Sequence, residues 1–316
     1  MLVSVVICTC NIDNYQNLVE AVDSLSMQTH RETEVVIVVD SSDELLCQKV
    51  VAHYSDRNNI KVALTGQGLG AFGAGNMGVQ MARGEIIAFT DDDAVAERNW
   101  LENLVYTYEK SDAISVGGKI LPMWICSKPD YLPEEMYWLI GATQQGFAEE
   151  EDTYVRNTFG PNMSFRKEVF ERVGLFDKRL GFVQRPASYM QGGEAELALR
   201  MKQKLGKGVI YNPKAIVYHR VSSSKIKVRT LLKRAFYQGY SKAQLKRLSG
   251  STEALTVEKS YLNRLLVRNI PSRVKRIFWG LKRTREITQL SFLVVLTLSV
   301  GIGFLYGYVK RVQKSC

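Results

Sequence analysis

The feature that restricts the fold most is an alternation of short apolar runs and amphipathic segments through roughly the first 120 residues. Residues 3–9 are apolar and rich in β-branched side chains, which is typical of a strand buried on both faces of a parallel sheet. A helix is expected next, with Asn14 as its N-cap. Strands are then predicted at residues 34–40, 60–65 and 85–91, with helices at 43–54 and 74–82. This order predicts crossover connections and a doubly wound α/β sheet, which binds ligands at the carboxyl ends of its strands.

The pattern continues less regularly to residue 219. Residues 115–121 and 209–218 are predicted strands, and residues 167–173 and 193–205 are predicted helices. Residues 122–152 contain Pro, Trp, Tyr and acidic residues without a clear period, which indicates loops and short helices.

Charge is distributed unevenly along the chain. The net charge is +10 overall, but residues 220–316 contain 21 basic and 3 acidic residues, which leaves a charge of −8 for residues 1–219. A hydrophobic share of 46% with 23% charged residues is typical of globular proteins and excludes disordered, collagen-like and multi-span membrane chains. The basic rear part is expected to contact something anionic.

Two features favour a reducing compartment. The five cysteines are odd in number, and Cys8 and Cys10 alternate inside an apolar run, so they do not form a disulfide framework. Residues 2–9 have no basic leader and no small-residue cleavage site after them, which favours a strand over a signal peptide.

The rear part contains two basic amphipathic segments and one uncharged segment. Residues 225–247 and 264–285 each carry eight basic residues beside large apolar side chains. Residues 290–309 carry no charge, and as a helix they would span roughly the 30 Å of a bilayer's hydrocarbon core. We predict a transmembrane helix here; a buried helix of a globular protein is the alternative.

Three consecutive carboxylates, Asp91, Asp92 and Asp93, end the predicted strand at residues 85–91. Burying carboxylates in series is unfavourable unless a cation neutralises them. Mg²⁺ or Mn²⁺, held by carboxylate and phosphate oxygens, is the expected ion. The alternative is a solvated helix cap, because acidic residues favour helix N-termini. The spacing alone favours neither.

Residues 68–73 match G-x-G-x-x-G, the pattern of dinucleotide-binding loops. That fingerprint belongs to the turn after the first strand, whereas this segment follows the third. A loop for another nucleotide, or a flexible connection, is therefore favoured over a nicotinamide-dependent oxidoreductase. Asp40 ends the second strand and is either a ligand of a base or ribose or a turn residue.

Two glutamates and a histidine complete the candidate residues. Glu194 and Glu196 open a predicted helix, where they are either partners of the helix dipole or, in one case, a general base. His219 ends the last strand; in isolation it is a structural residue, and beside a metal and a phosphate it is a ligand.

Together these segments resemble glycosyltransferase family 2, whose GT-A fold is a Rossmann-like, mostly parallel sheet. The resemblance covers about residues 1–245 and rests on order and spacing. The segments are VSVVICTCN at 3–11, VIVVD at 36–40, GN at 75–76, ARGEIIAFTDDD at 82–93, GPNMSFR at 160–166, GLFD at 174–177 and GGEAEL at 192–197.

The resemblance implies an inverting transfer of a sugar from a nucleotide diphosphate sugar. The nucleotide sugar would be bound by Thr9, Asn11, Asp40, Asn76, Asp91 and Asp92. Asp93 and His219 would hold Mn²⁺ or Mg²⁺, and Asn162 and Met163 would lie on the acceptor side. Glu194 stands where the family usually has an Asp as base, which leaves Glu196 as a substitute.

The segments VYHR at 217–220 and RAFYQGYSKA at 234–243 are similar to archaeal enzymes that build dolichyl-phosphate-linked glycans for protein N-glycosylation, such as the glucosyl-dolichyl phosphate glucuronosyltransferases. This implies a UDP-linked donor, carrying glucuronic acid or a hexose, and a dolichyl or polyprenyl phosphate-linked acceptor. A polyprenyl-phosphate monosaccharide synthase is the alternative.

The predicted organisation is a GT-A catalytic domain at residues 1–220, amphipathic membrane-associated helices at 221–288, and a transmembrane helix with a short tail at 289–316. Basic residues are more numerous before the apolar segment than after it, where Lys310, Arg311 and Lys314 follow. This bias places the catalytic domain on the cytoplasmic face of the cell membrane, in contact with anionic lipids. Gly303 and Gly307 form a small-x-x-x-small pair, which raises the hypothesis of a homodimer. No nucleic-acid partner is expected, because the uncharged segment disfavours a nucleic-acid binder.

Overall fold

The structure is a computed structural model that describes residues 1–148, 153–180, 191–250, 252–280 and 283–309. The chain forms two compact units. Unit 1 comprises residues 1–123, 148–189 and 193–220, and unit 2 comprises residues 124–147, 190–192 and 221–316. The division into three parts at residues 220 and 288 stays a prediction.

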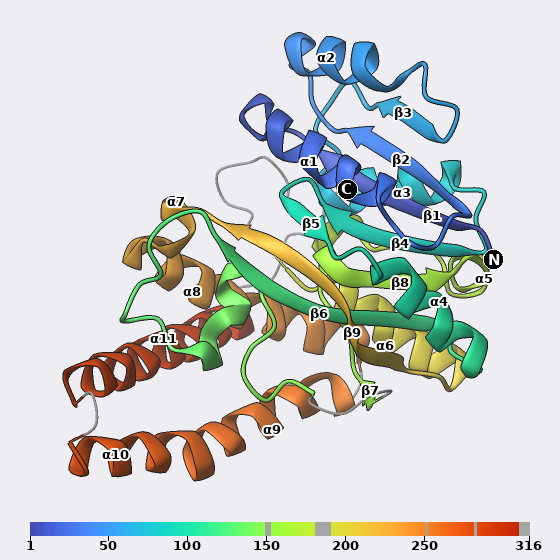
Figure 1. Ribbon diagram of the computed structural model, residues 1–316. Helices are drawn as coiled ribbons and strands as arrows, with labels where there is room; N and C mark the ends of the chain where they lie inside the picture. Colours follow the sequence, from blue (N-terminus) through green and yellow to red (C-terminus); the bar gives the residue numbers. More distant parts are fainter. Residues whose placement is uncertain (149–152, 181–190, 251, 281–282, 310–316) are drawn as a thin grey trace. The chain divides into compact units, whose positions relative to one another are not determined.

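Unit 1 is built on one mixed β-sheet (Figure 1). Its strands are β1 (Val3–Thr9), β2 (Thr33–Val39), β3 (Ile60–Leu64), β4 (Ile86–Asp91), β5 (Ala94–Ala96), β6 (Ser115–Trp124), β7 (Thr153–Val155), β8 (Met163–Arg166) and β9 (Val209–Val221). The order is β3-β2-β1-β4-β8-β6-β9-β5, with β7 beside β9. The strands from β3 to β4 are parallel, whereas β8 pairs antiparallel with β4 and β6, and β9 with β5 and β7.

Helices cover both faces of this sheet, because the strands alternate apolar side chains toward each face. The helices are α1 (Tyr15–Ser26), α2 (Glu44–Tyr54), α3 (Ala71–Met81), α4 (Trp100–Lys110), α5 (Lys167–Val173) and α6 (Gly193–Leu205). Short 3₁₀ turns are η1 (Ile12–Asn14), η3 (Gly160–Asn162) and η4 (Lys178–Leu180). Helices α1, α2 and α4 contribute to the core on one face, and α3, α5 and α6 to the core on the other. The predicted α/β fold is confirmed.

Two local predictions, the start of α3 and the N-cap of α1, differ from the structure because side chains make contacts with residues far away in the sequence. Helix α3 begins at Ala71, ahead of the predicted residue 74, after a loop whose Leu69 and Gly70 amides donate to Asp40. Asn14 precedes α1, but its side chain makes no capping hydrogen bond to the helix backbone; its oxygen accepts from the Asn17 side chain at 3.4 Å. Instead the amide of Asn14 donates to Asp92.

Unit 2 is helical. It contains η2 (Glu134–Ile140), α7 (Ser223–Ile226), α8 (Val228–Ser249), η5 (Thr252–Leu255), α9 (Thr256–Arg264), the π-helical η6 (Leu265–Asn269), α10 (Ile270–Phe278) and α11 (Arg283–Val309). Among the described residues, α11 alone is long and apolar enough to cross a membrane, judged by length and composition. The tail with Lys310, Arg311 and Lys314 lies outside the described residues.

Helices α8 and α11 pack closely through glycines. A Cβ on Gly239 would lie 1.9 Å from the Val300 carbonyl oxygen, and one on Gly303 would lie 1.9 Å from that of Phe236. The Gln244 side chain donates to the Gly307 carbonyl at 2.9 Å. Gly303 and Gly307 therefore have partners inside the chain, which gives them a role that requires no second copy; the homodimer stays a prediction.

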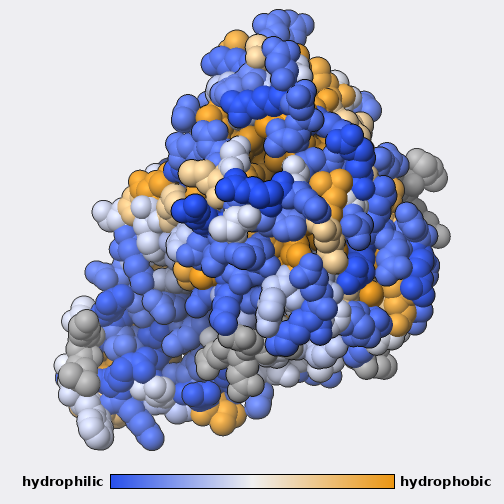
Figure 2. All heavy atoms as spheres, turned by 45° about the vertical axis from the view of Figure 1, so that its right-hand side comes forward, coloured by the Kyte–Doolittle hydropathy of each residue, from blue (hydrophilic) through white to orange (hydrophobic). Residues whose placement is uncertain are grey.

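Hydrophilic side chains cover most of the face shown in Figure 2, with smaller hydrophobic areas between them. Large apolar side chains do reach the surface in unit 2. They include Leu266, Val267, Phe278, Trp279, Leu298, Ile302 and Leu305.

Candidate active site

The three consecutive aspartates lie where β4 ends and β5 begins. Strand β4 ends at Asp91, and β5 starts at Ala94, which is paired with His219 of β9. The Arg220 amide donates to the Asp93 carbonyl at 2.9 Å. This antiparallel register places His219 beside the aspartates, although about 125 residues separate them in the sequence.

Asp91, Asp93 and His219 form one cluster. Each offers a ligand atom, and these atoms lie within 4.8 Å of one another. His219 Nε2 lies 3.1 Å from Asp93 Oδ1 and 3.8 Å from Asp91 Oδ2. His219 is buried, Asp93 is partly buried, and the Asp91 side chain is 45% exposed. Of the residues in this cluster, Asp93 and His219 match the predicted metal ligands, and Asp91 joins them.

Asp92 points away from that cluster into the interior. Its carboxylate accepts hydrogen bonds from the Thr9 hydroxyl at 2.7 Å and from the Asn14 amide at 3.3 Å. Burial, together with the charges of Asp93 and Asp91, raises the pKa of Asp92 to about 7, against the effect of these hydrogen bonds. Thr9 and Asp92 thus contact one another, and their contact with a nucleotide stays a prediction.

Glu194 faces the aspartate cluster across Gly160. A Cβ on Gly160 would lie 3.6 Å from Glu194 Oε1 and 3.8 Å from Asp91 Oδ1, so both carboxylates face the Cα of this glycine. Helix α6 is brought to this position by Gly193, on which a Cβ would lie 2.3 Å from the ring of Phe72. The absence of a side chain at Gly160 therefore leaves room between the two carboxylates, and its absence at Gly193 lets α6 pack against Phe72.

Glu196 is differently placed. It is buried, and its carboxylate binds the Arg200 guanidinium through two hydrogen bonds, Nε at 2.5 Å and Nη2 at 2.8 Å. Arg200 also donates to the carbonyls of Val173 and Leu175. The pair ties α6 to the end of α5, so the geometry separates the two glutamates that the sequence left as alternatives.

Other predicted nucleotide-binding residues make structural contacts. Asp40 is buried and accepts from the Leu69 and Gly70 amides at 2.7 and 2.8 Å, which closes the glycine-rich loop. The Asn76 side chain exchanges two hydrogen bonds of 2.9 Å with the backbone of Phe176. A role for Asp40 and Asn76 in nucleotide binding stays a prediction.

The remaining predicted residues fall at the surface and in the core. Asn11 is exposed after β1, and its side chain accepts from the Asp13 amide. Asn162 is fully buried; its oxygen accepts from the Trp100 indole, and its amide nitrogen donates to two carbonyls. Met163 lies in the core. The side chains of Asn162 and Met163 are thus committed to packing, and their acceptor role stays a prediction.

Sequence reasoning missed Arg200 and the role of Asn14. The spacing of Glu196 and Arg200, four residues apart in a helix, is a signal that could have identified the pair. No signal in the sequence connects Asn14 with Asp92, because their contact depends on how β1 and β4 pair.

The donor set of the cluster fits a divalent cation. Two carboxylates and an imidazole supply oxygen and nitrogen ligands, a mixed set that suits Mn²⁺ and is less typical of Mg²⁺, which prefers oxygen. Two like charges and a buried imidazole gathered in one place are stabilised by such a cation. The Glu194 carboxylate nearby provides a proton acceptor.

Solved structures share this fold. A mannosyltransferase from Pyrobaculum calidifontis, solved in complex with GDP-Man and Mn²⁺, aligns with a TM-score of 0.59 and 16% identity, over 96% of this chain and 87% of that one. GalNAc-T7, solved with UDP, GalNAc and Mn²⁺, aligns with a TM-score of 0.57 and 20% identity, over 83% of this chain and 54% of that one. At these identities the likeness establishes the fold, a GT-A-like mixed α/β fold.

Sequence comparisons establish the family in addition to the fold. The glucosyl-dolichyl phosphate glucuronosyltransferase of Haloferax volcanii is 35% identical over 308 residues, which cover 97% of this chain and 96% of the relative. The glycosyltransferase GlyG of Streptococcus pneumoniae serotype 4 is 32% identical over 37% of this chain and 38% of its own. The pattern of the family described as glycosyl transferase family 2 matches residues 4–174. By this match and by the nearly full-length relative, the chain belongs to glycosyltransferase family 2 and is a hexosyltransferase.

Proposed function

We propose that this glycosyltransferase moves a sugar, with inversion, from a nucleotide diphosphate sugar to a dolichyl- or polyprenyl-phosphate-linked acceptor. The observation that carries the proposal is the convergence of the Asp91–Asp93–His219 cluster and the Glu194 carboxylate on one place in unit 1. The nearly full-length relative is named for a glucosyl-dolichyl phosphate acceptor and glucuronic acid, which supports this acceptor class and this sugar.

Asp91, Asp93 and His219 are the residues that would hold Mn²⁺ or Mg²⁺. When bound, such a cation supplies positive charge that stabilises a departing diphosphate. The residues of this chain fix the ligand atoms: the β5–β9 pairing holds His219 against Asp93, and the end of β4 holds Asp91.

Glu194 is the residue that we assign as general base. Its carboxylate faces Asp91 across Gly160, and a base must lie within hydrogen-bond reach of the acceptor hydroxyl close to the reacting diphosphate. It would take the proton of the acceptor hydroxyl as that oxygen bonds to the sugar carbon and the bond between that carbon and the diphosphate oxygen breaks. Glu196 is unsuited to this, since the Arg200 guanidinium donates hydrogen bonds to both of its carboxylate oxygens.

The position of Glu194 also bears on the acceptor. A polyprenyl-phosphate monosaccharide synthase uses a phosphate acceptor that is already ionised, so a base contributes little there. A carboxylate placed beside the cation ligands favours an acceptor hydroxyl, as on a lipid-linked sugar.

We further propose that the enzyme works at the cytoplasmic face of the cell membrane, in glycan assembly for protein N-glycosylation. The support is the apolar helix α11, the basic residues of 221–309, which suit the anionic cytoplasmic leaflet, and the name of the Haloferax relative.

The test is transfer by the purified full-length chain in detergent. It is incubated with Mn²⁺, with UDP-glucuronic acid, UDP-glucose or GDP-mannose as donor, and with either dolichyl phosphate or glucosyl-dolichyl phosphate as acceptor. We expect mass spectrometry to detect a glycolipid one sugar larger, from glucosyl-dolichyl phosphate with a UDP-linked donor. Product from dolichyl phosphate alone would instead establish the synthase reaction, and no product from any pair would refute the proposed lipid acceptor.

A further inference from the structure

After its charged first turn, helix α11 presents an uncharged apolar face from Ile287 to Val309. Leu298, Ile302 and Leu305 are 61%, 60% and 66% exposed, and Val294 and Val295 continue the same face toward the N-terminus. These positions recur at the spacing of one side of an α-helix. At about 1.5 Å per residue, residues 287–309 of α11 make a face roughly 35 Å long.

Helix α8 covers the opposite face of α11 along its C-terminal part. Along the pair, Ser299 donates to the carbonyl of Leu232, Gly303 meets Phe236, and Gly307 accepts from Gln244. The residue numbers rise together on both helices, so α8 and α11 run in the same direction. The glycine contacts bring the two backbones so close that the helices act as one body.

The parallel direction determines what a membrane crossing would require. Residues 250–282 connect the end of α8 back to the start of α11. If α11 crossed a bilayer, the part of α8 packed against it would enter the hydrocarbon in the same direction, and residues 250–282 would have to return to the start of α11. A crossing by α11 alone is incompatible with this packing.

The charges make such an insertion unfavourable. Helix α8 carries six basic residues, and α9 to α10 carry six more. Each Lys or Arg is strongly disfavoured in hydrocarbon. Several are also tied to other segments of unit 2: Arg234 donates to the Leu139 carbonyl, and Lys242 pairs with Glu258.

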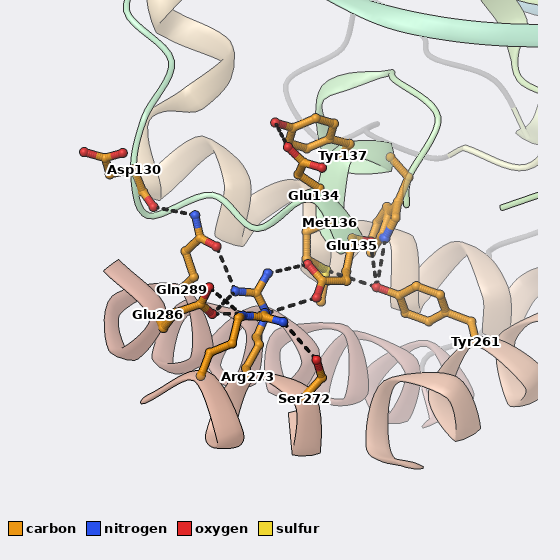
Figure 3. Close-up of polar contacts among 12 residues, drawn as sticks. Asp130, Glu134, Glu135, Met136, Tyr137, Tyr261, Ser272, Arg273, Glu286 and Gln289 are labelled. Carbon is orange, nitrogen blue, oxygen red and sulfur yellow. Dashed lines mark hydrogen bonds and ion pairs between the residues drawn. The ribbon is translucent and has the colours of Figure 1, made fainter. Parts of the chain in front are cut away.

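The start of α11 is anchored in the same unit by a buried polar network (Figure 3). The Arg273 guanidinium of α10 binds both carboxylate oxygens of Glu135, at 2.7 and 3.0 Å. It also donates to Glu286 and Gln289 of α11, and Gln289 donates to the Asp130 carbonyl. Helix α11 is therefore held to protein on one side from its first turns to its last.

The charge of unit 2 is complementary to an anionic surface. Basic side chains are exposed beside the apolar ones on several helices: Arg229, Lys233, Lys246, Arg247, Lys259, Arg264, Arg268, Lys275 and Arg283. Two of the three acidic residues of 221–309, Glu258 and Glu286, are ion-paired. Phe278 and Trp279, 83% and 80% exposed at the end of α10, add aromatic side chains of the kind that occupy membrane interfaces.

We propose that α11 lies along the surface of an anionic lipid membrane, with its apolar face in the lipid and α8 on the protein side, and does not cross it. The helix pair is amphipathic as a unit: lipid contacts the exposed side of α11, and the basic residues reach lipid head groups. This rests on the proposed function only in taking a lipid membrane as the working place of the enzyme.

Membrane topology of the full chain tests the orientation without any substitution. Epitope tags are placed at both ends, and protease is added to inside-out vesicles and to spheroplasts of an expressing bacterium. We expect both tags to be digested in inside-out vesicles and both to be protected in spheroplasts. Tags on opposite faces would show that α11 crosses the membrane and would overturn the proposal.

The contact face is tested by vesicle binding of the L298E/I302E double variant. We expect its binding to phosphatidylglycerol-containing vesicles to weaken by about tenfold or more, since two apolar contacts become charges. The matched control is L45E/L64E, at exposed leucines of unit 1, which should bind as the unsubstituted chain does. Circular dichroism and UDP binding verify that both variants fold, and L305E provides an independent single change. Undiminished vesicle binding by folded L298E/I302E and L305E would refute the assigned face. Because neither readout involves sugar transfer, their failure is distinguishable from failure of the proposed reaction.

Discussion

Both units contain clustered carboxylates, and they neutralise them differently. In unit 1, Asp91 and Asp93 face each other and an imidazole, and a further carboxylate, Glu194, faces Asp91. In unit 2, the buried carboxylate of Glu135 is matched by the guanidinium of Arg273 through two hydrogen bonds. A cluster of like charges is favourable only with a cation from outside, whereas a matched pair is complete by itself. The arrangement in unit 1 therefore indicates a cation-binding site, and the arrangement in unit 2 indicates a structural ion pair.

Removing a carboxylate from the unit 1 cluster is the strongest test of this difference between the two units. We expect D93A to reduce sugar transfer by about 10³-fold or more, because a cation ligand is lost. Steady-state turnover with saturating Mn²⁺ measures this, and chelation of divalent cations should reduce the unsubstituted enzyme to a similar level. The control is D112N, since Asp112 is an exposed carboxylate of unit 1 that pairs with Lys207 at the surface. Equal activity of D93A and D112N would contradict the assignment of Asp93.

The two glutamates of α6 allow the same comparison within a single helix, because Glu194 faces the cluster and Glu196 pairs with Arg200. We expect E194Q to lower kcat by about 10²- to 10³-fold with an unchanged melting temperature, because it removes the general base. E196Q should retain more activity and lower the melting temperature, since it leaves the charge of Arg200 without its carboxylate partner. Kinetics and thermal unfolding on both variants decide the matter. The reverse result would make Glu196 the base.

Local patterns predicted much of unit 1. Strands β1 to β4 and helix α6 are each shown by apolar runs or helical spacing, and these need no knowledge of distant residues. The sequence singled out two members of the Asp91–Asp93–His219 cluster as metal ligands, because Asp93 follows β4 and His219 lies near the end of β9, and the pairing of β5 with β9 brings them together; their metal role stays a prediction. The direction of Asp92 could not be predicted, because Asp92 lies in the turn between β4 and β5 and its contacts with Thr9 and Asn14 depend on the pairing of β1 with β4.

Local patterns predicted less of unit 2. Amphipathic spacing indicated its helices, but it did not show which helix covers which. In the sequence, Arg273 is one of several basic residues of a basic helix. In the structure it is buried and pairs with Glu135, 138 positions earlier in the chain. The glycines of α11 indicated close packing, and the structure supplies the partner, α8. Long-range pairing of this kind leaves no periodic signal in a single sequence.

Removing one partner of the unit 2 pair should affect stability and spare nucleotide binding. We expect R273A to destabilise unit 2 by about 3–5 kcal/mol, because it leaves the buried Glu135 carboxylate unpaired. The R273M/E135L double variant should recover most of this loss, since an apolar pair of similar volume replaces the ion pair. Urea unfolding measures both, and UDP binding reports on unit 1. If R273A were as stable as the unsubstituted chain, the network would have no structural role.

The smallest expected effect concerns Glu34, a buried carboxylate of unit 1 that is neutralised as Glu135 is. Burial raises the pKa of Glu34, but hydrogen bonds from Ser4 and Arg83 and the nearby charge of Lys61 outweigh burial and lower the pKa from 4.5 to about 2. Because the folded state holds the proton more weakly than the unfolded state, ionised Glu34 stabilises the fold above about pH 4.5, and this contribution is lost as the pH falls toward 2. E34Q should therefore lower the free energy of unfolding by about 1–3 kcal/mol at pH 7, with a difference that shrinks below pH 4.5. Two residues away, the exposed Glu32 pairs with the N-terminal amine, so E32Q should change stability little at either pH. A pH-independent difference for E34Q would show that its charge is not what the surrounding donors stabilise.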